Sequence, residues 1–161
     1  MSVIVCNSGP LIALGKIGQV ELLRELFGSV VVVPVVKEEV EHGGRGGEAS
    51  DVFIRNPWIE IRPTNRAVDP LLSAVLDAGE AATITLANNV GASLVLIDET
   101  KARKIAANVF KLPVIGTGRV LVEAKHAGLI RAVKPWVDTL RAKGYWLSDA
   151  IVRQLLVQAS E

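Results

Sequence analysis

The segment LVLID, residues 94–98, contains the clearest buried-strand pattern in the chain, because four apolar residues follow one another and an acidic residue ends the run. A strand without polar alternation must be covered on both of its faces, which is typical of parallel sheets. Residues 3–6, 30–33 and 113–115 are similar apolar runs. Residues 58–61 alternate weakly between two prolines, which favours an edge strand.

Segments with helical spacing of apolar residues separate these strands. We expect a first helix after Ser8, whose side chain can cap it, and another from Asp69-Pro70 to Gly79. The remaining predicted helices cover 20–27, 34–42, 80–89, 101–110, 117–127, 135–143 and the segment that begins at residue 148. Strands that alternate with helices predict an α/β fold, with a central parallel sheet in a three-layer α/β/α arrangement.

The chain has 161 residues, of which 50% are hydrophobic and 22% are charged. This composition excludes a disordered or fibrous protein, and the length suits one domain with one core. We therefore expect residues 1–161 to form a single domain. Its C-terminal helices, at about 129–158, would pack on the rest or form an oligomer face, since the last one carries an apolar stripe.

No apolar run reaches the roughly 18 residues of a membrane span, and the N-terminus lacks a signal-peptide pattern. We therefore expect a cytoplasmic protein with no membrane partner. The single cysteine, Cys6, excludes a disulfide framework and a cysteine-based zinc site. The two histidines, His42 and His126, do not form a histidine-based zinc site.

Charge is distributed unevenly along the sequence. Residues 1–100 hold 7 Lys and Arg against 13 Asp and Glu, whereas residues 101–161 hold 11 against 4. One interpretation is a set of solvated helix faces that happen to sort by sequence. The other is an acidic half that holds a metal ion beside a basic half that attracts phosphates.

Four oxygen-bearing side chains fall where an α/β sheet places its ligand site, beyond the carboxyl ends of the strands. Asn7 follows the first strand and Asp98 follows the strand at 94–97, while Glu80 begins one predicted helix and Glu39 lies in another. A set without His or Cys suits a hard cation such as Mg²⁺ or Mn²⁺. Each of the four residues also has a simpler explanation. Asp98 can cap a helix, and Glu80 can interact favourably with the dipole of its helix. Glu39 can face solvent, and Asn7 can occupy a turn.

Other motifs are incomplete. Gly116-Thr117-Gly118 lacks the third glycine and the acidic residue of a dinucleotide site. The sequence has neither a phosphate-binding loop nor a nucleophile elbow. Trp136, Tyr145 and Trp146 could stack on bases, but packing among the C-terminal helices is the better interpretation.

Five segments carry a resemblance to a known family: VCNSGPLIALGKIG, VPVVKEEV, DAGEAATITLA, LVLIDETKARKIA and VIGTGRVLVEAKHAGLI. In this order they resemble the PIN-domain proteins, and most of all the prokaryotic subfamily similar to VapC toxins. The resemblance covers roughly residues 3–156, and the combination of NSGPLIAL, GEA and LIDE is specific. It implies a PIN-like α/β fold and a Mg²⁺- or Mn²⁺-dependent nuclease site made of several acidic residues.

The resemblance also implies roles for particular residues. Asp98 and Glu80 would be metal ligands, Glu39 would be a ligand or orient the attacking water, and Asn7 would be a neutral ligand where the family usually has aspartate. Ser8 and Thr117 would support the site. The residues that would hold the nucleic-acid backbone are Lys101, Arg103, Lys104 and Arg119.

By the same resemblance the chain is an endoribonuclease that cleaves single-stranded RNA, and the toxin of a toxin–antitoxin pair. A homodimer and a small antitoxin protein would be its partners. Because Asn7 removes one negative charge from the site, the alternative is a catalytically silent PIN-fold module that binds RNA or a protein. A small-molecule- or nucleotide-binding α/β domain is a third hypothesis, which rests on fold analogy alone.

Overall fold

The structure, a computed structural model, describes residues 2–43 and 47–161. Its centre is a five-stranded sheet with the strand order β3-β2-β1-β4-β5. The strands are β1 (Ile4–Cys6), β2 (Val31–Val32), β3 (Glu60–Ile61), β4 (Leu94–Leu96) and β5 (Val114–Ile115). All of their pairings are parallel. The predicted parallel sheet is therefore confirmed, and the segment expected to be an edge strand does lie at the edge, as β3.

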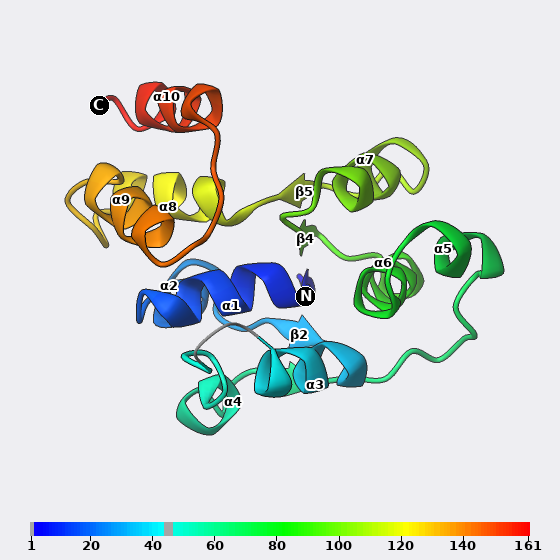
Figure 1. Ribbon diagram of the computed structural model, residues 1–161. Helices are drawn as coiled ribbons and strands as arrows, with labels where there is room; N and C mark the ends of the chain where they lie inside the picture. Colours follow the sequence, from blue (N-terminus) through cyan, green and yellow to red (C-terminus); the bar gives the residue numbers. More distant parts are fainter. Residues whose placement is uncertain (1, 44–46) are drawn as a thin grey trace.

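Helices flank this sheet on both faces, which confirms the three-layer α/β/α arrangement (Figure 1). In the view of Figure 1, α5, α6 and α7 lie on one side of the strands, and α1, α8 and α9 lie on the other. The helices are α1 (Ser8–Lys16), α2 (Glu21–Phe27), α3 (Pro34–His42), α4 (Val52–Arg55), α5 (Pro70–Val75), α6 (Ala78–Val90), α7 (Thr100–Asn108), α8 (Thr117–His126), α9 (Lys134–Ala142) and α10 (Asp149–Gln158). Of the helices described, none has the length and apolar character that a bilayer crossing requires.

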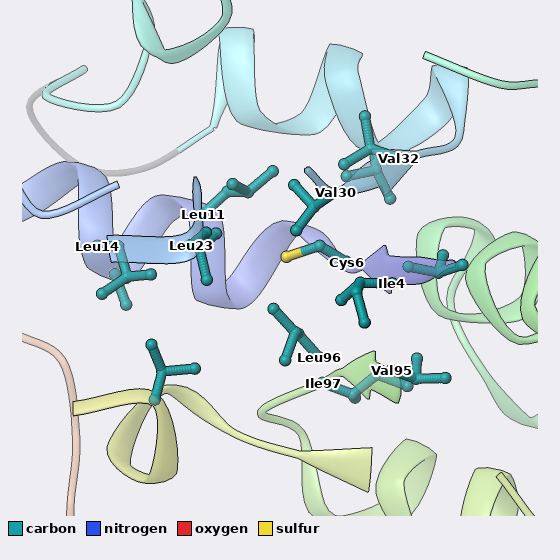
Figure 2. Packing of buried hydrophobic residues seen from close by; sticks show 14 of the residues in the cluster. Ile4, Cys6, Leu11, Leu14, Leu23, Val30, Val32, Val95, Leu96 and Ile97 are labelled. Carbon is teal, nitrogen blue, oxygen red and sulfur yellow. The ribbon is translucent and has the colours of Figure 1, made fainter. Parts of the chain in front are cut away.

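The core lies along the central strands β1 and β4. Cys6 and Leu96 are fully buried there, and Leu11 of α1 reaches the same region (Figure 2). Burial raises the pKa of the Cys6 thiol well above its usual value, and the nearby charge of Asp98 adds to the effect. Cys6 is therefore a small apolar core residue, as its place in an apolar strand predicts.

The helix boundaries and capping residues differ from the predicted ones at three places. α5 ends at Val75 rather than at Gly79, because Asp77 caps a new helix, α6, that contains Gly79. α1 begins at Ser8, and no side chain caps it. The cap of α7 is Glu99, which accepts a hydrogen bond from the Ala102 N–H, so the interpretation of Asp98 as a helix cap was wrong.

The C-terminal helix α10 packs on the first turn of α8. A Cβ at Gly118 would lie 2.5 Å from the Leu155 side chain, so only a glycine lets the two helices approach this closely. The Leu155 side chain is buried in this contact, and Val137 and Leu140 of α9 are fully buried. The loop before α10 is thereby held beside the start of α8.

Candidate active site

The predicted site residues surround the start of α1, directly after β1. The Asn7 backbone N–H donates to the Leu96 carbonyl at 2.9 Å, which ties this point of the chain to β4. The Asn7 side-chain oxygen accepts a long hydrogen bond of 3.4 Å from the Thr83 hydroxyl on α6. Since Asn7 is buried, its amide oxygen lies between the sheet and α6 rather than in a solvent-exposed turn.

Glu39 reaches this place from α3, and its carboxylate lies against the backbone of Gly79 on α6. A Cβ at Gly79 would lie 2.6 Å from Oε2 of Glu39 and closer still to Oε1. Burial raises the pKa of Glu39, and the negative charge of Asp77 adds to this, although hydrogen bonds with Ser8 and the Gly79 backbone oppose the shift. Ser8 is thus a neighbour of Glu39, and its supporting role stays a prediction.

Glu80 occupies the third position of α6 and completes a capping box with Asp77. The Glu80 N–H donates to the Asp77 carboxylate at 2.8 Å, and the Glu80 carboxylate accepts from the Asp77 N–H at 3.2 Å. Burial raises the pKa of Glu80, and the charges of Asp77 and Glu99 add to it, while the Asp77 N–H opposes the shift. One of its oxygens therefore already has a structural role.

Asp98 lies at the carboxyl end of β4, on the other side of the α1 start. Its carboxylate accepts two hydrogen bonds of 2.7 Å from Thr117, one from the backbone N–H and one from the hydroxyl. A Cβ at Gly9 would stand 3.4 Å from the nearer Asp98 oxygen, so this carboxylate borders the first turn of α1. Thr117 is completely buried at the start of α8, where it holds the orientation of Asp98.

Tyr145 also lies near Asp98. From the sequence, Tyr145 was predicted only to pack among the C-terminal helices. Burial raises the pKa of the Tyr145 phenol well above its usual value, and the charge of Asp98 and a hydrogen bond with Asp98 act in the same direction. Thr117 and Arg103 oppose the shift. Tyr145 lies in the loop between α9 and α10, and no motif or spacing in the sequence signals that this loop reaches the end of β4.

Three of the four predicted residues form two neighbouring groups, and Asn7 is hydrogen-bonded both to α6 and to β4. Glu39 and Glu80 lie at the start of α6, and Asp98 lies with Thr117 and Tyr145 across the α1 start. Within residues 2–43 and 47–161, no three Asp, Glu, His or Cys side chains gather closely enough to enclose a metal ion. By donor chemistry the set fits Mg²⁺ or Mn²⁺, because every member offers a carboxylate or amide oxygen. Mg²⁺ is commonly bound through only one or two carboxylates and keeps several waters.

The predicted nucleic-acid contacts divide into two kinds. Lys101, Arg103 and Lys104 are exposed on α7, and none of them has an ion-pair partner in the part of the chain that the structure describes. Arg119 on α8 is held by Glu123 at 2.5 Å and by the Gln158 side chain at 3.0 Å. Its guanidinium is therefore positioned by the protein.

A pocket of about 430 Å³ opens beside Asp98. One wall comes from α7 and the start of α8, with Arg103 and Arg119, and the opposite wall comes from the loop before α10 and from α10 itself, with Trp146 and Gln154. We call it the Asp98 pocket. A second pocket of about 440 Å³, beside α1 and α4, contains none of the predicted site residues.

Comparison with known proteins agrees with this fold. The sequence model of the PIN-domain family matches residues 3–161. No curated protein and no solved structure matches the chain. PIN domains are generally nucleases and typically use divalent metals, so the fold is of a nuclease type. Because the match covers nearly the whole sequence, the chain belongs to the PIN-domain family.

Proposed function

We propose that this protein is a Mg²⁺- or Mn²⁺-dependent endoribonuclease that hydrolyses phosphodiester bonds in single-stranded RNA. The supporting observation is the meeting of three chain segments at the start of α1. Glu39 and the Glu80 helix lie on one side of residues 7–9, and Asp98 lies on the other. Oxygen donors that follow β1 and β4, and others on α3 and α6, thus lie on the two sides of the α1 start in a domain of a nuclease family.

In this proposal, Asp98 and Glu80 hold the metal, with Asn7 as a neutral ligand. A bound Mg²⁺ or Mn²⁺ would supply a more acidic water and would offset the negative charge on the phosphate oxygens. Thr117 keeps the Asp98 carboxylate oriented, since it donates to both oxygens. Glu39, whose pKa is raised by burial and by Asp77, orients the attacking water through a hydrogen bond or acts as a further ligand.

The charges around the site favour binding of a polyanion at α7, which is basic, and disfavour it at the start of α6, which is acidic. Glu39, Asp77 and Glu80 concentrate negative charge at the start of α6, and the raised pKa values of Glu39 and Glu80 reflect this together with burial. Arg103 of α7 lines the pocket beside Asp98, and Lys101 and Lys104 are exposed on the same helix. Lys101, Arg103 and Lys104 would therefore hold the phosphates, and affinity would fall as salt rises.

We further propose that the protein is the toxin of a toxin–antitoxin pair, that it forms a homodimer, and that a small antitoxin blocks the site. These finer assignments rest on the resemblance of its motifs to the VapC-like proteins. The substrate class, single-stranded RNA, rests on the same resemblance.

The test is cleavage of a labelled single-stranded RNA with Mn²⁺, Mg²⁺ or EDTA. We expect the native protein to cleave only with metal and Asp98→Asn to lose at least about 100-fold in rate, because a ligand carboxylate becomes a neutral amide. Asp138→Asn is the matched control, since Asp138 is an exposed acid on α9 that pairs with Lys134. Activity in Asp98→Asn equal to that of the control would remove Asp98 from the mechanism.

The alternative, a silent module that binds RNA or a protein, is favoured by Asn7, a neutral residue at the buried centre of the site. Asn7→Asp separates the two hypotheses. If the native protein is inert with metal and Asn7→Asp cleaves, the asparagine has silenced the site. If native protein and Asn7→Asp are both inert, the nuclease proposal fails and the binding module replaces it.

A further inference from the structure

The wall of the Asp98 pocket that faces α7 is formed by the C-terminal part of the chain. Leu155 sits on Gly118, where a Cβ would come within 2.5 Å of it, so α10 cannot move away from α8 without opening a gap. The Tyr145 phenol lies near Asp98, whose negative charge adds to the effect of burial and raises the pKa of the phenol. The loop between α9 and α10 therefore lies beside the proposed cleavage site, next to a helix that packs on the start of α8.

This wall presents a large aromatic surface to solvent. Trp146 lines the pocket, yet 79% of its surface is exposed. The interpretation of Trp146 as a packing residue was therefore wrong, although Tyr145 beside it is largely buried. Ile151, the neighbouring apolar residue of the wall, is 43% exposed. A solvent-exposed indole beside a polar site can stack on a planar ring of a ligand.

The opposite wall supplies a cation close to Asp98. A Cβ at Gly116 would lie 2.8 Å from an Asp98 oxygen and 3.0 Å from a guanidinium nitrogen of Arg103, so both side chains border the same backbone point. Arg103 forms no ion pair with any residue that the structure describes. On the α10 wall, Gln154 adds an amide that can donate and accept hydrogen bonds.

A ligand that matches these walls has a flat ring with hydrogen-bonding edges and an adjoining negative charge, which describes a nucleotide. We propose that the Asp98 pocket is a nucleotide subsite, in which one base of a single-stranded RNA stacks on Trp146 while its phosphate is bound by Arg103. This rests on the proposed function and extends it, because it assigns the C-terminal loop to substrate recognition. An exposed tryptophan alone would also suit a protein partner, but a concave site with an unpaired arginine beside a carboxylate favours RNA.

The test measures RNA binding in EDTA, where metal-dependent cleavage is absent. Fluorescence anisotropy follows a labelled single-stranded RNA of mixed sequence, about 10 nucleotides long. Trp146→Ala should weaken binding about 5- to 100-fold, the usual range for one stacked base, and Trp146→Phe should recover most of the loss. Ile54→Ala is the control, because Ile54 is 81% exposed on α4, away from the pocket. The RNA affinity of this variant should equal that of the native protein.

Arg103 provides an independent measurement. Removal of one phosphate contact in Arg103→Gln should lower the slope of log affinity against log salt by about 0.7, whereas Trp146→Ala should leave that slope unchanged. The same slope in native protein and Arg103→Gln would overturn the assignment of Arg103 to the phosphate.

Binding and cleavage distinguish failure of this inference from failure of the nuclease proposal. A native protein that cleaves RNA while Trp146→Ala binds it with native affinity keeps the nuclease and overturns the subsite. A native protein that binds RNA through Trp146 but never cleaves keeps the subsite and overturns the nuclease. If native protein binds no RNA, or if Trp146→Ala changes only the oligomeric state in light scattering, the nucleotide assignment is wrong.

Discussion

Gly79 shows how closely the candidate site depends on the size of one side chain. The carboxylate of Glu39 occupies the volume that a Cβ of residue 79 would need. The atoms in the way are the end of a flexible side chain, so a larger residue would displace Glu39 rather than the helix. The glycine of the GEA motif therefore leaves room for the Glu39 carboxylate, although from the sequence alone it was interpreted as a helix end.

Gly79→Ala should consequently separate stability from activity. We expect the free energy of unfolding to change by less than about 1 kcal/mol, because alanine is favoured over glycine within a helix and Glu39 can swing away. Metal-dependent RNA cleavage should fall about 10-fold or more, as in Glu39→Gln. Urea unfolding and a cleavage assay on the same preparation measure both quantities. Full activity in Gly79→Ala would mean that the position of Glu39 does not matter.

The positions of single residues could be predicted from the sequence where a strand end determines them. Asn7 and Asp98 follow adjacent parallel strands, β1 and β4, so their proximity follows from the sheet. Tyr145 could not be predicted, because its approach to Asp98 depends on how α9 and α10 pack. For Arg119, the sequence shows the charge but not the partners Glu123 and Gln158, which hold its guanidinium.

At the scale of helices, boundaries depend on capping groups that compete with apolar spacing. Asp77 and Glu80 have the spacing of a capping box, and this signal in DAGE was present in the sequence. Gly79 was interpreted instead as the end of the preceding helix. The structure separates α5 from α6 at Leu76, whose backbone is extended and whose side chain is buried.

The start of α9 is held by a carboxylate from beyond α10. Glu161 accepts hydrogen bonds from the Val133 N–H at 2.7 Å and the Lys134 N–H at 3.1 Å, and pairs with Lys125 at 3.2 Å. Desolvation alone would raise the pKa of Glu161, but these donors outweigh it and lower the pKa below its usual 4.5. Because the folded-state pKa is the lower one, the stabilisation is complete above about pH 4.5 and is lost as the pH falls further.

Glu161→Gln should therefore destabilise the fold by on the order of 1 kcal/mol at pH 7, a modest value because the group is partly exposed. The difference between native protein and variant should shrink below pH 4.5, since a protonated Glu161 resembles glutamine. Urea unfolding at pH 7, 5 and 3.5 measures it. A difference that stays constant over this range would show that the charge of Glu161 contributes nothing.

At the scale of the whole molecule, the apolar runs predicted the fold class and the parallel sheet, but not the strand order. β2, β3 and β5 have only two residues each, too few to carry information about their neighbours. The assignment of residues 1–161 to a single domain stays a prediction. It is supported by the packing of Leu155 of α10 against Gly118 of α8 and by the full burial of Val137 and Leu140 of α9.

If the chain is one domain, its two ends should unfold together. Two variants place tryptophan reporters in different parts of the chain: Trp136→Phe with Trp146→Phe leaves only Trp58, beside β3, and Trp58→Phe leaves the C-terminal pair. We expect the urea midpoint from tryptophan fluorescence to coincide with that from far-UV circular dichroism in both variants. An earlier midpoint for the C-terminal reporters would show that α9 and α10 form a separate unit.

The parallel pairing of β1 with β4 also has a consequence for synthesis on the ribosome. Val5 lies opposite Val95, so β1 is made long before the strand that completes one of its edges. At about 5–20 residues per second, the intervening chain takes roughly 5–20 s to synthesise. During that interval a nascent chain carries an apolar strand with one unpaired edge, which is a surface that chaperones bind and that aggregation uses.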